Sequence, residues 1–450
     1  MTRIAKGAAA QGVTVGLGRA WSMILILSAL SIVSFLDRFA LGLLVQPLKQ
    51  DLGVSDVQIG LLFGSAFALF YGAITLPLAR LADRGNRVRL IVVAAVCWSA
   101  CTILSGFATS FLMLVLLRVG LAVGEAALTP STFSLIGDLL PPNRRTFGGT
   151  VYNGLGMAGA SGAYIIGSAT IGLVYWIQKD GYFVDLRVWQ AVFIITGLPG
   201  LLLAAILVTV GREPARVAAA VHVEAASFRD VLRYVKTQGW LYAGLFLGAG
   251  FIQLGTNAFL AWAPTYLSRA YGMPIVDAGL TYGLYNLIAF VTGSLVVPLV
   301  GVWVGRYRRD GVVLIGAVCA VLHLVFCVAA VLQSSPSAFL FFTFIGMMLS
   351  VGGASNVLVS IHMFTPPRMR ATLTAAITIC LTTITLGLGP PLAAALSDRF
   401  GSGPDALGVG MGLVAALGGS IAILLFCAAR KRVLLYLAMS EGRPAVEASS

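Results

Sequence analysis

The sequence predicts an all-α membrane protein with twelve transmembrane helices, arranged as two halves of six helices with both termini in the cytoplasm. The prediction rests on the apolar composition, the recurrence of long apolar segments and the placement of the basic residues between them. Of the 450 residues, 58% are apolar and only 10% are charged. A soluble protein carries roughly a quarter charged residues, so the lipid bilayer is expected to cover most of this surface.

Apolar segments of about twenty or more residues recur along the chain, the length that an α-helix needs to cross about 30 Å of hydrocarbon. The first segment is too long for the apolar part of a signal peptide and lacks a small-residue cleavage site, so it is expected to remain as a membrane helix. The approximate spans are 20–47, 58–80, 89–108, 111–136, 147–175, 188–210, 240–268, 276–304, 311–332, 337–363, 370–396 and 405–429.

The basic residues predict the orientation. With the N-terminus inside, the cytoplasmic segments hold 23 of the 30 Lys and Arg residues, and the outer loops hold five. Lys and Arg concentrate in cytoplasmic loops of membrane proteins. This asymmetry predicts cytoplasmic termini, and it explains the formal charge of +13 without a nucleic-acid partner.

Two pairs of loops repeat along the chain. The segment 141–146 after the fourth span resembles 366–372 after the tenth, 225 residues later, and the basic loop 83–89 resembles 305–309 at an offset of 222. Because both members of each pair are cytoplasmic, the two halves must run in the same direction. We therefore predict an N-terminal half at residues 1–211, a polar cytoplasmic linker at 212–239 and a C-terminal half at 240–450.

The loop after the second span carries a family resemblance. Residues 79–87, ARLADRGNR, resemble the Gly-x-x-x-Asp-Arg-x-Gly-Arg signature of the major facilitator superfamily, with Ala79 and Asn86 in place of the two glycines. The resemblance implies the major facilitator fold, a parallel repeat of two halves with the substrate path between them. It also implies a cytoplasmic gate formed by Asp83, Arg84 and Arg87 near the start of the eleventh span. The alternative is that these arginines only set the topology.

A narrower resemblance is to the spinster-like branch of that superfamily. Residues 34–39, SFLDRF, are similar to its Asn-Tyr-x-Asp-Arg motif, and residues 118–126, RVGLAVGEA, to its Arg-x-x-x-Gly-x-Gly-Glu-Ala motif. In the second motif Ala122 stands at the first glycine. This resemblance implies proton-linked movement of an amphipathic solute, which in animal members is lysolipid-like or sphingoid-like.

Four charged residues lie well inside the predicted spans: Asp37 and Arg38 in the first, Arg118 and Glu125 in the fourth. Charges inside a membrane are costly and normally face the protein interior or a wet cavity. Their depths along the two helices overlap, so we expect one neutral cluster. One interpretation is a fixed salt-bridge network. The other assigns proton coupling to Asp37 first and Glu125 second, with Arg38 and Arg118 as charge partners that can also bind an anionic group.

The predicted substrate cavity is otherwise lined by uncharged polar and aromatic residues. For many of them the alternative is an interhelical hydrogen bond. The candidates are Asn153, Gln253, Asn257, Trp262, Tyr285, Asn286 and Asn356.

These features predict a proton-coupled secondary transporter in the plasma membrane (the inner membrane if the cell is Gram-negative). It would move a small amphipathic or anionic solute by alternating access, as a monomer and with no cofactor beyond protons. The alternatives are an organic-acid uptake symporter or facilitator, and a membrane receptor built on a transporter scaffold. No nucleotide-binding loop and no nucleophile–His–acid set is present, so ATP-driven and enzymatic functions are not expected. The six cysteines are not grouped with histidines at metal-ligand spacing.

Overall fold

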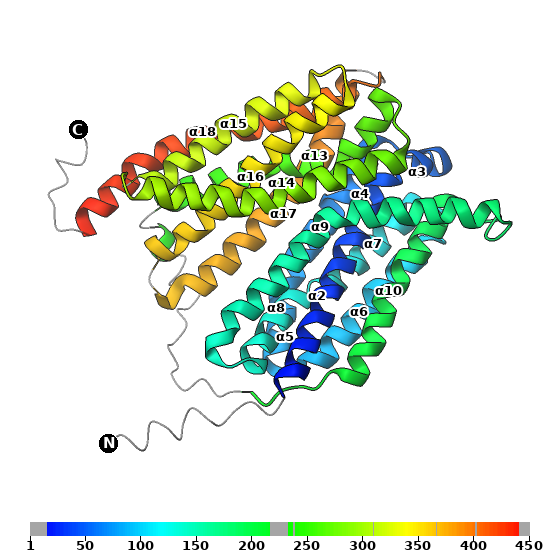
Figure 1. Ribbon diagram of the computed structural model, residues 1–450, viewed down its shortest axis with the longest axis horizontal. Helices are drawn as coiled ribbons and strands as arrows, with labels where there is room; N and C mark the ends of the chain where they lie inside the picture. The colour runs from blue at the N-terminus through cyan, green and yellow to red at the C-terminus, as the bar shows by residue number, and fades with distance from the viewer. Residues whose placement is uncertain are drawn as a thin grey trace. The chain divides into compact units, whose positions relative to one another are not determined.

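The computed structural model describes residues 16–216, 233–236, 239–308, 310–365, 367–400 and 403–440, and within these ranges every regular element is helical. Much of the predicted linker (217–232 and 237–238) lies outside them. In chain order (Figure 1) the elements are α2 (Leu17–Phe39), η1 (Ala40–Leu43), α3 (Val45–Leu52), α4 (Asp56–Phe63), α5 (Ser65–Arg84), α6 (Arg87–Ser105), α7 (Phe111–Glu125), α8 (Leu128–Leu139), α9 (Pro142–Lys179), α10 (Val188–Val210), α12 (Gly239–Tyr242), η2 (Ala243–Leu247), α13 (Gly248–Tyr271), α14 (Ile275–Gly305), α15 (Gly311–Val331), α16 (Pro336–Phe364), α17 (Pro367–Arg399) and α18 (Ala406–Ser440).

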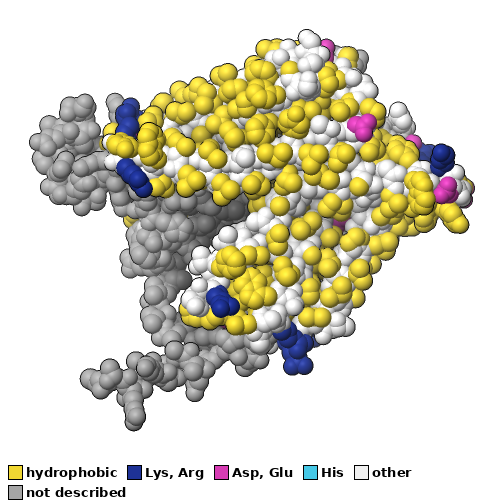
Figure 2. Space-filling model, viewed as in Figure 1, with side chains coloured by type: hydrophobic (Ala, Val, Ile, Leu, Met, Phe, Trp, Pro, Cys, Tyr) yellow, Lys and Arg dark blue, Asp and Glu magenta, His cyan; other side chains and the backbone are white. Residues whose placement is uncertain are grey.

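Among the described residues, twelve helical segments are long and apolar enough to cross a membrane. They coincide with the twelve predicted spans to within a few residues at most ends. The face drawn in Figure 2 is covered largely by hydrophobic side chains, with few charged groups. Many large apolar side chains are exposed, among them Leu116, Leu202 and Leu299 at more than 60%. In lipid such a surface needs no further partner, so the prediction of an all-α multi-pass membrane protein is confirmed.

Local sequence signals explain several helix ends. Asn86 accepts a hydrogen bond from the Arg89 N–H at the start of α6, and Ser110 accepts one from the Met113 N–H at the start of α7. Such N-caps satisfy backbone donors that have no partner inside the helix. Gly272 ends α13 with a φ of +66°, a conformation that glycine adopts at little cost.

The chain forms two compact units. The first contains Met1–Val54 and Leu69–His222, and the second Ser55–Ala68 and Val223–Ser450. In the first unit α2 packs along α9, and α6 packs along α7 and α10. Small residues allow these close approaches. Gly159 of α9, for example, lies against Ile32 of α2, where an added Cβ would sit 2.9 Å from the Ile32 Cα.

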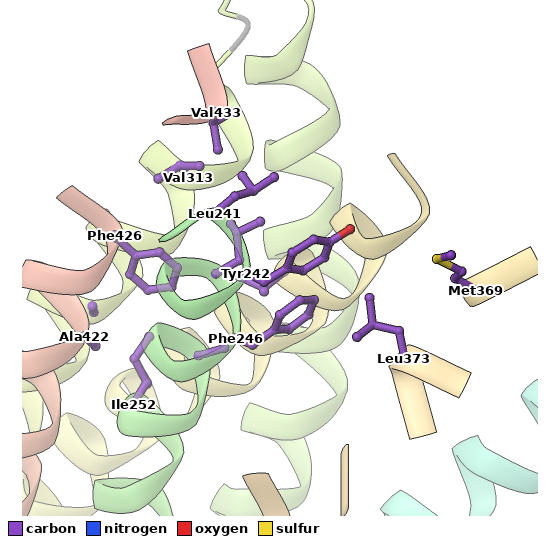
Figure 3. Close-up of a cluster of buried hydrophobic side chains, with 14 residues drawn as sticks. Leu241, Tyr242, Phe246, Ile252, Val313, Met369, Leu373, Ala422, Phe426 and Val433 are labelled. Atoms are coloured by element: carbon purple, nitrogen blue, oxygen red, sulfur yellow. The ribbon is translucent and has the colours of Figure 1, made fainter. Parts of the chain in front are cut away.

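In the second unit, α13 packs on α17 and α18, and α16 packs on α14 and α15. A cluster of buried side chains joins several of these helices (Figure 3). Phe426 of α18 and Ile252 of α13 have no exposed surface, and the Tyr242 ring stacks on Phe246 at 5.6 Å. This apolar cluster fixes one end of the unit that carries most of the predicted polar cavity residues.

The second membrane segment is broken at Gly64, and its first part, α4, belongs to the second unit. There Asp56 forms two hydrogen bonds with Arg269 of α13, at 2.7 and 2.8 Å. The Ser65 hydroxyl donates to the carbonyl of Gly387 in α17 at 2.6 Å. These contacts attach α4 to α13 and α17, whereas α5 from Leu69 onward belongs to the first unit.

Candidate functional site

Two helix breaks in the first unit lie beside three of the four intramembrane charges. The predicted first span runs unbroken to residue 47, but α2 ends at Phe39 and passes into a 3-10 turn. Asp37 and Arg38 therefore lie in its last turn. The fourth span is likewise divided, because α7 ends at Glu125 and α8 begins at Leu128. Broken membrane helices expose backbone groups that ions and polar side chains can use.

The structure brings the four charged residues together, as predicted. Arg38 donates a hydrogen bond to an oxygen of Glu125 at 2.5 Å, and the side chains are 11% and 1% exposed. Arg118 donates to the main-chain carbonyl of Asp37 at 2.9 Å. The last carbonyls of a helix have no partner within it, so Arg118 satisfies one of them at the end of α2. The charges of Arg118 and Glu125 both act on the Asp37 carboxyl.

The Asp37 carboxylate is buried with both of its oxygens unpaired among the described residues. The residue is 1% exposed, and neither carboxylate oxygen has a hydrogen-bond partner within the described part of the chain. The neighbouring Thr102 hydroxyl donates to the carbonyl of Trp98 at 3.1 Å. One nitrogen of Arg118 and one oxygen of Glu125 are also without partners in the described residues. Unpaired charges are expensive to bury, so this cluster holds binding capacity that the fold itself does not use.

In the second unit, several predicted cavity residues bond neighbouring helices. Ser350 of α16 donates to the Gln253 side chain at 2.6 Å, and Asn257 donates to Thr385 of α17 at 3.3 Å. Trp262 has no exposed surface, and its indole N–H donates to the carbonyl of Pro390 at 2.9 Å. These contacts fit the interhelical alternative, and in this conformation the Trp262 ring is not open to a solute.

The other predicted cavity residues differ in exposure. Asn153 on α9 and Tyr285 on α14 are exposed, Asn286 is half-buried, and Asn356 on α16 is 5% exposed. Tyr285 packs edge-on against Phe344 of α16 with the ring centroids 6.4 Å apart. Tyr285 and Asn286 also line a small crevice between α14 and α16. Within the second unit, Tyr285 and Asn286 thus share one small crevice.

A larger crevice in the second unit was not predicted. It has a volume of about 50 Å³ and opens between α17 and the start of α13, next to the π-helical turn η2. Its walls are apolar apart from Thr385, and Phe251 and Leu381 are among the lining residues. Irregular turns of this kind often accompany functional sites.

The predicted cytoplasmic gate residues have separate environments in the first unit. Arg87 is 1% exposed and binds Asp138 of α8 at 2.5 Å and Glu213 at 2.6 Å. Asp83 and Arg84 are exposed. Arg216 donates to the backbone carbonyls of Ala82, Asp83 and Gly85, which end α5. The sequence reasoning did not identify Asp138, Glu213 or Arg216 as partners. The sequence showed only that these three residues are charged and lie near the ends of predicted spans.

The comparison with protein families settles the family. A model described as the Major Facilitator Superfamily matches residues 27–390. The chain belongs to the Major Facilitator Superfamily. The sequence signature at residues 79–87 and the twelve membrane helices agree with that assignment.

Curated relatives within the superfamily are transporters by name. An MFS-type efflux pump of Mycolicibacterium smegmatis is 29% identical over 282 residues, which are 62% of this chain and 62% of the pump. A probable L-galactonate transporter of Escherichia coli (strain K12) is 26% identical over 335 residues, covering 70% and 68%. The sphingosine-1-phosphate transporter SPNS2 of Mus musculus is 28% identical over 247 residues, covering 54% and 43%. This chain thus spans less than two thirds of the length of the pump and of SPNS2.

Solved structures give the same fold. A bacterial homolog to the human lysosomal transporter Spinster, in an inward-facing and unoccupied conformation, matches with a TM-score of 0.80 and 24% identity. The match covers 95% of this chain and 98% of that one. A D-xylose–proton symporter matches with a TM-score of 0.62 at 15% identity, covering 89% and 97%. The predicted major facilitator fold and the resemblance to the spinster-like branch are therefore confirmed.

Proposed function

We propose that this superfamily member is a proton-coupled secondary transporter that moves an amphipathic or anionic solute across the plasma membrane by alternating access. The observation that carries the proposal is the Asp37 carboxylate, which is buried without a hydrogen-bond partner in the described residues, close to the charge of Arg118. A buried carboxylate in this state costs several kcal/mol. A bound proton removes that cost, so the site suits reversible protonation.

Within this proposal the four charges have different roles. Asp37 is the first proton carrier. Glu125 is the second, because its carboxylate is already paired with Arg38 and can take up a proton only as that pair loosens. In that state Arg38 binds an anionic group of the solute through its planar guanidinium. Asp83 and Arg84, both exposed at the cytoplasmic end of α5, act at the gate.

The apolar crevice of the second unit supports the amphipathic character of the solute. Its walls are apolar, its single polar residue, Thr385, is bonded to Asn257, and an apolar part of a solute can pack against such walls without leaving a polar group unpaired. A second candidate is an organic-acid uptake symporter, favoured by the 26% identity to a probable L-galactonate transporter. A sugar acid needs the charge cluster but not the apolar crevice.

Reconstitution into proteoliposomes tests the proposal. We expect a pH gradient to accelerate flux of an anionic amphiphile, with sphingosine-1-phosphate as the first probe and L-galactonate as the second. Acceleration of L-galactonate flux alone would favour the organic-acid symporter. Binding of either probe without any flux would favour a receptor on a transporter scaffold. If the flux does not depend on the pH gradient, proton coupling is contradicted and the protein is a facilitator.

A further inference from the structure

Arg38 contacts two aromatic rings in addition to Glu125. Its Cζ atom lies over the Phe35 ring at 5.2 Å from the centroid and over the Tyr71 ring at 5.5 Å. Phe35 precedes Arg38 by one turn of α2, and Tyr71 comes from α5. We call these two rings the aromatic cradle. Both distances are within the range of a cation–π interaction, which is strongest where water is excluded, and the Arg38 side chain is only 11% exposed.

We propose that the aromatic cradle holds the Arg38 guanidinium in place when Glu125 is protonated, which makes Phe35 and Tyr71 positioning residues of the coupling site. The inference rests on the proposed function, because it takes the neutral state of Glu125 to be part of the transport cycle. A guanidinium can bind a carboxylate through its N–H groups while an aromatic ring contacts its face. The cradle contact therefore need not be lost when the ion pair is.

The rings are themselves fixed by neighbouring residues. The Thr129 hydroxyl is a hydrogen-bond partner of the Tyr71 hydroxyl, and it lies 3.5 Å from the hydroxyl of Tyr152 on α9. Thr129 follows Glu125 by four residues, so one stretch of chain positions both the carboxylate and the Tyr71 ring. Phe35 stacks on Phe39, with centroids 6.2 Å apart and planes 5° from parallel. A cradle with fixed rings can retain the cation without rearrangement.

The ring contacts do not depend on the charge of Glu125. Arg118 carries the same sign of charge as Arg38 and bonds the Asp37 carbonyl. The charges that act on Asp37, the other acid of the cluster, are those of Glu125 and Arg118. When Glu125 is neutral, Phe35 and Tyr71 still contact the largely buried guanidinium, and such contacts offset part of the cost of burying a cation.

For the solute, the aromatic cradle provides a preorganised anion-binding site at Arg38. When Glu125 carries a proton, the cradle keeps Arg38 in place while its N–H groups lose their charged partner. A carboxylate or phosphate group can then bind there without reordering the arginine side chain, which otherwise costs conformational entropy. Without the cradle, the same position would have to be assembled as the solute arrives.

A double-mutant cycle tests the cradle without any solute or pH gradient, so its failure is distinct from failure of the proposed function. Glu125→Gln keeps the shape of the side chain but makes it permanently neutral. We expect Tyr71→Leu to lower the Tm of the purified protein by at most about 2 °C in the wild type, and by at least about 4 °C more in the Glu125→Gln background. Tyr71→Phe, which keeps the ring, should match its parent within about 2 °C in both backgrounds.

Controls separate this coupling from general loss of stability. Tyr175→Leu removes an aromatic side chain that is 51% exposed on α9 and should have the same effect in both backgrounds. If the Glu125→Gln/Tyr71→Leu protein does not fold, adding Arg38→Met removes the largely buried cation and should restore a folded protein. Equal losses from Tyr71→Leu in the two backgrounds, or no recovery with Arg38→Met, would overturn the proposal.

Discussion

Arg118 donates its hydrogen bond to the main-chain carbonyl of Asp37, at 2.9 Å, and the carboxylate of the same residue remains without a hydrogen-bond partner in the described structure. The arginine therefore stabilises the end of α2 while its charge acts on the carboxylate through space. The backbone hydrogen bond of Arg118 and the effect of its charge on the Asp37 carboxylate are therefore separable. The protonation of Asp37 that we propose would leave the backbone contact between Arg118 and the end of α2 intact.

Replacing Arg118 with Met tests the backbone contact. The Arg118→Met protein loses the donor to the Asp37 carbonyl and keeps two buried acids with one buried base, so we expect a loss of about 3–5 kcal/mol in stability. Adding Asp37→Asn removes one of the two acids and should return part of that loss, because residues in one network are energetically coupled. Thermal unfolding of the single and double variants measures both. Strict additivity would show that the two side chains do not share a network.

Asp37→Asn tests the proton assignment. The amide keeps the shape of the side chain but cannot carry a proton between the two sides of the membrane, so acceleration of solute flux by a pH gradient should be abolished. The protein should remain folded and still exchange solute at equal pH. Glu125→Gln should reduce the acceleration too. Gradient-driven flux that survives in both variants would exclude these carboxylates as the coupling sites.

Arg87 is expected to be structural within the first unit. Its guanidinium is buried between Asp138 and Glu213, so Arg87→Met leaves two carboxylates without their shared partner and should cost about 3–5 kcal/mol. Arg84, three residues earlier, is exposed, and Arg84→Met should change stability by no more than about 0.5 kcal/mol. Thermal unfolding of the two variants is the measurement. Equal effects would mean that the buried ion pairs do not contribute to folding.

Much of the fold could be predicted from the sequence because lipid imposes a simple requirement. Each helix must be apolar over about twenty residues, so twelve spans are visible as apolar segments. Charges within such segments are rare and tend to face one another in the protein interior. For that reason Asp37, Arg38, Arg118 and Glu125 could be grouped from their positions in the sequence alone.

The contacts within the site could not be predicted in the same way. Helix periodicity does not reveal that α2 ends at Phe39, so the carbonyl of Asp37 could not be identified as the partner of Arg118. Arg87 was interpreted from a motif as a gate residue, but its burial depends on two acids that lie 51 and 126 residues further along the chain. Many acidic residues occur at helix ends, and the sequence does not select among them.

Asp310 gives a pH-dependent contribution to the stability of the second unit at the start of α15. Burial raises the pKa of this carboxyl, but hydrogen bonds and ion pairs with Arg308 and Arg430 outweigh burial and hold the pKa below its ordinary value. A group with a lowered native pKa stabilises the fold above its unfolded pKa, about 4, and the contribution is lost as pH falls through the native value. The Asp310→Asn protein lacks this contribution at every pH. As the pH falls from about 4 to about 2, the free energy of unfolding should therefore decrease more in the wild type than in the variant. Parallel unfolding curves for the two proteins over that range would contradict this assignment.

Gly60 of α4 should tolerate no side chain, whereas a glycine elsewhere in the membrane should accept one. A Cβ at Gly60 would lie 2.7 Å from the Cα of Pro391 in α17, so one of the two backbones would have to move. We expect Gly60→Ala to destabilise the protein by about 1–3 kcal/mol, as overpacking usually does. Gly172 on α9 has no heavy atom within 4 Å of an added Cβ, and Gly172→Ala should stabilise its helix by up to about 1 kcal/mol through the higher helix propensity of alanine. Both substitutions add the same methyl group. If Gly60→Ala lowers the stability and Gly172→Ala raises it in thermal unfolding, the difference is due to the contact of α4 with α17. A Gly60→Ala protein as stable as Gly172→Ala would show that α4 does not pack this closely on α17.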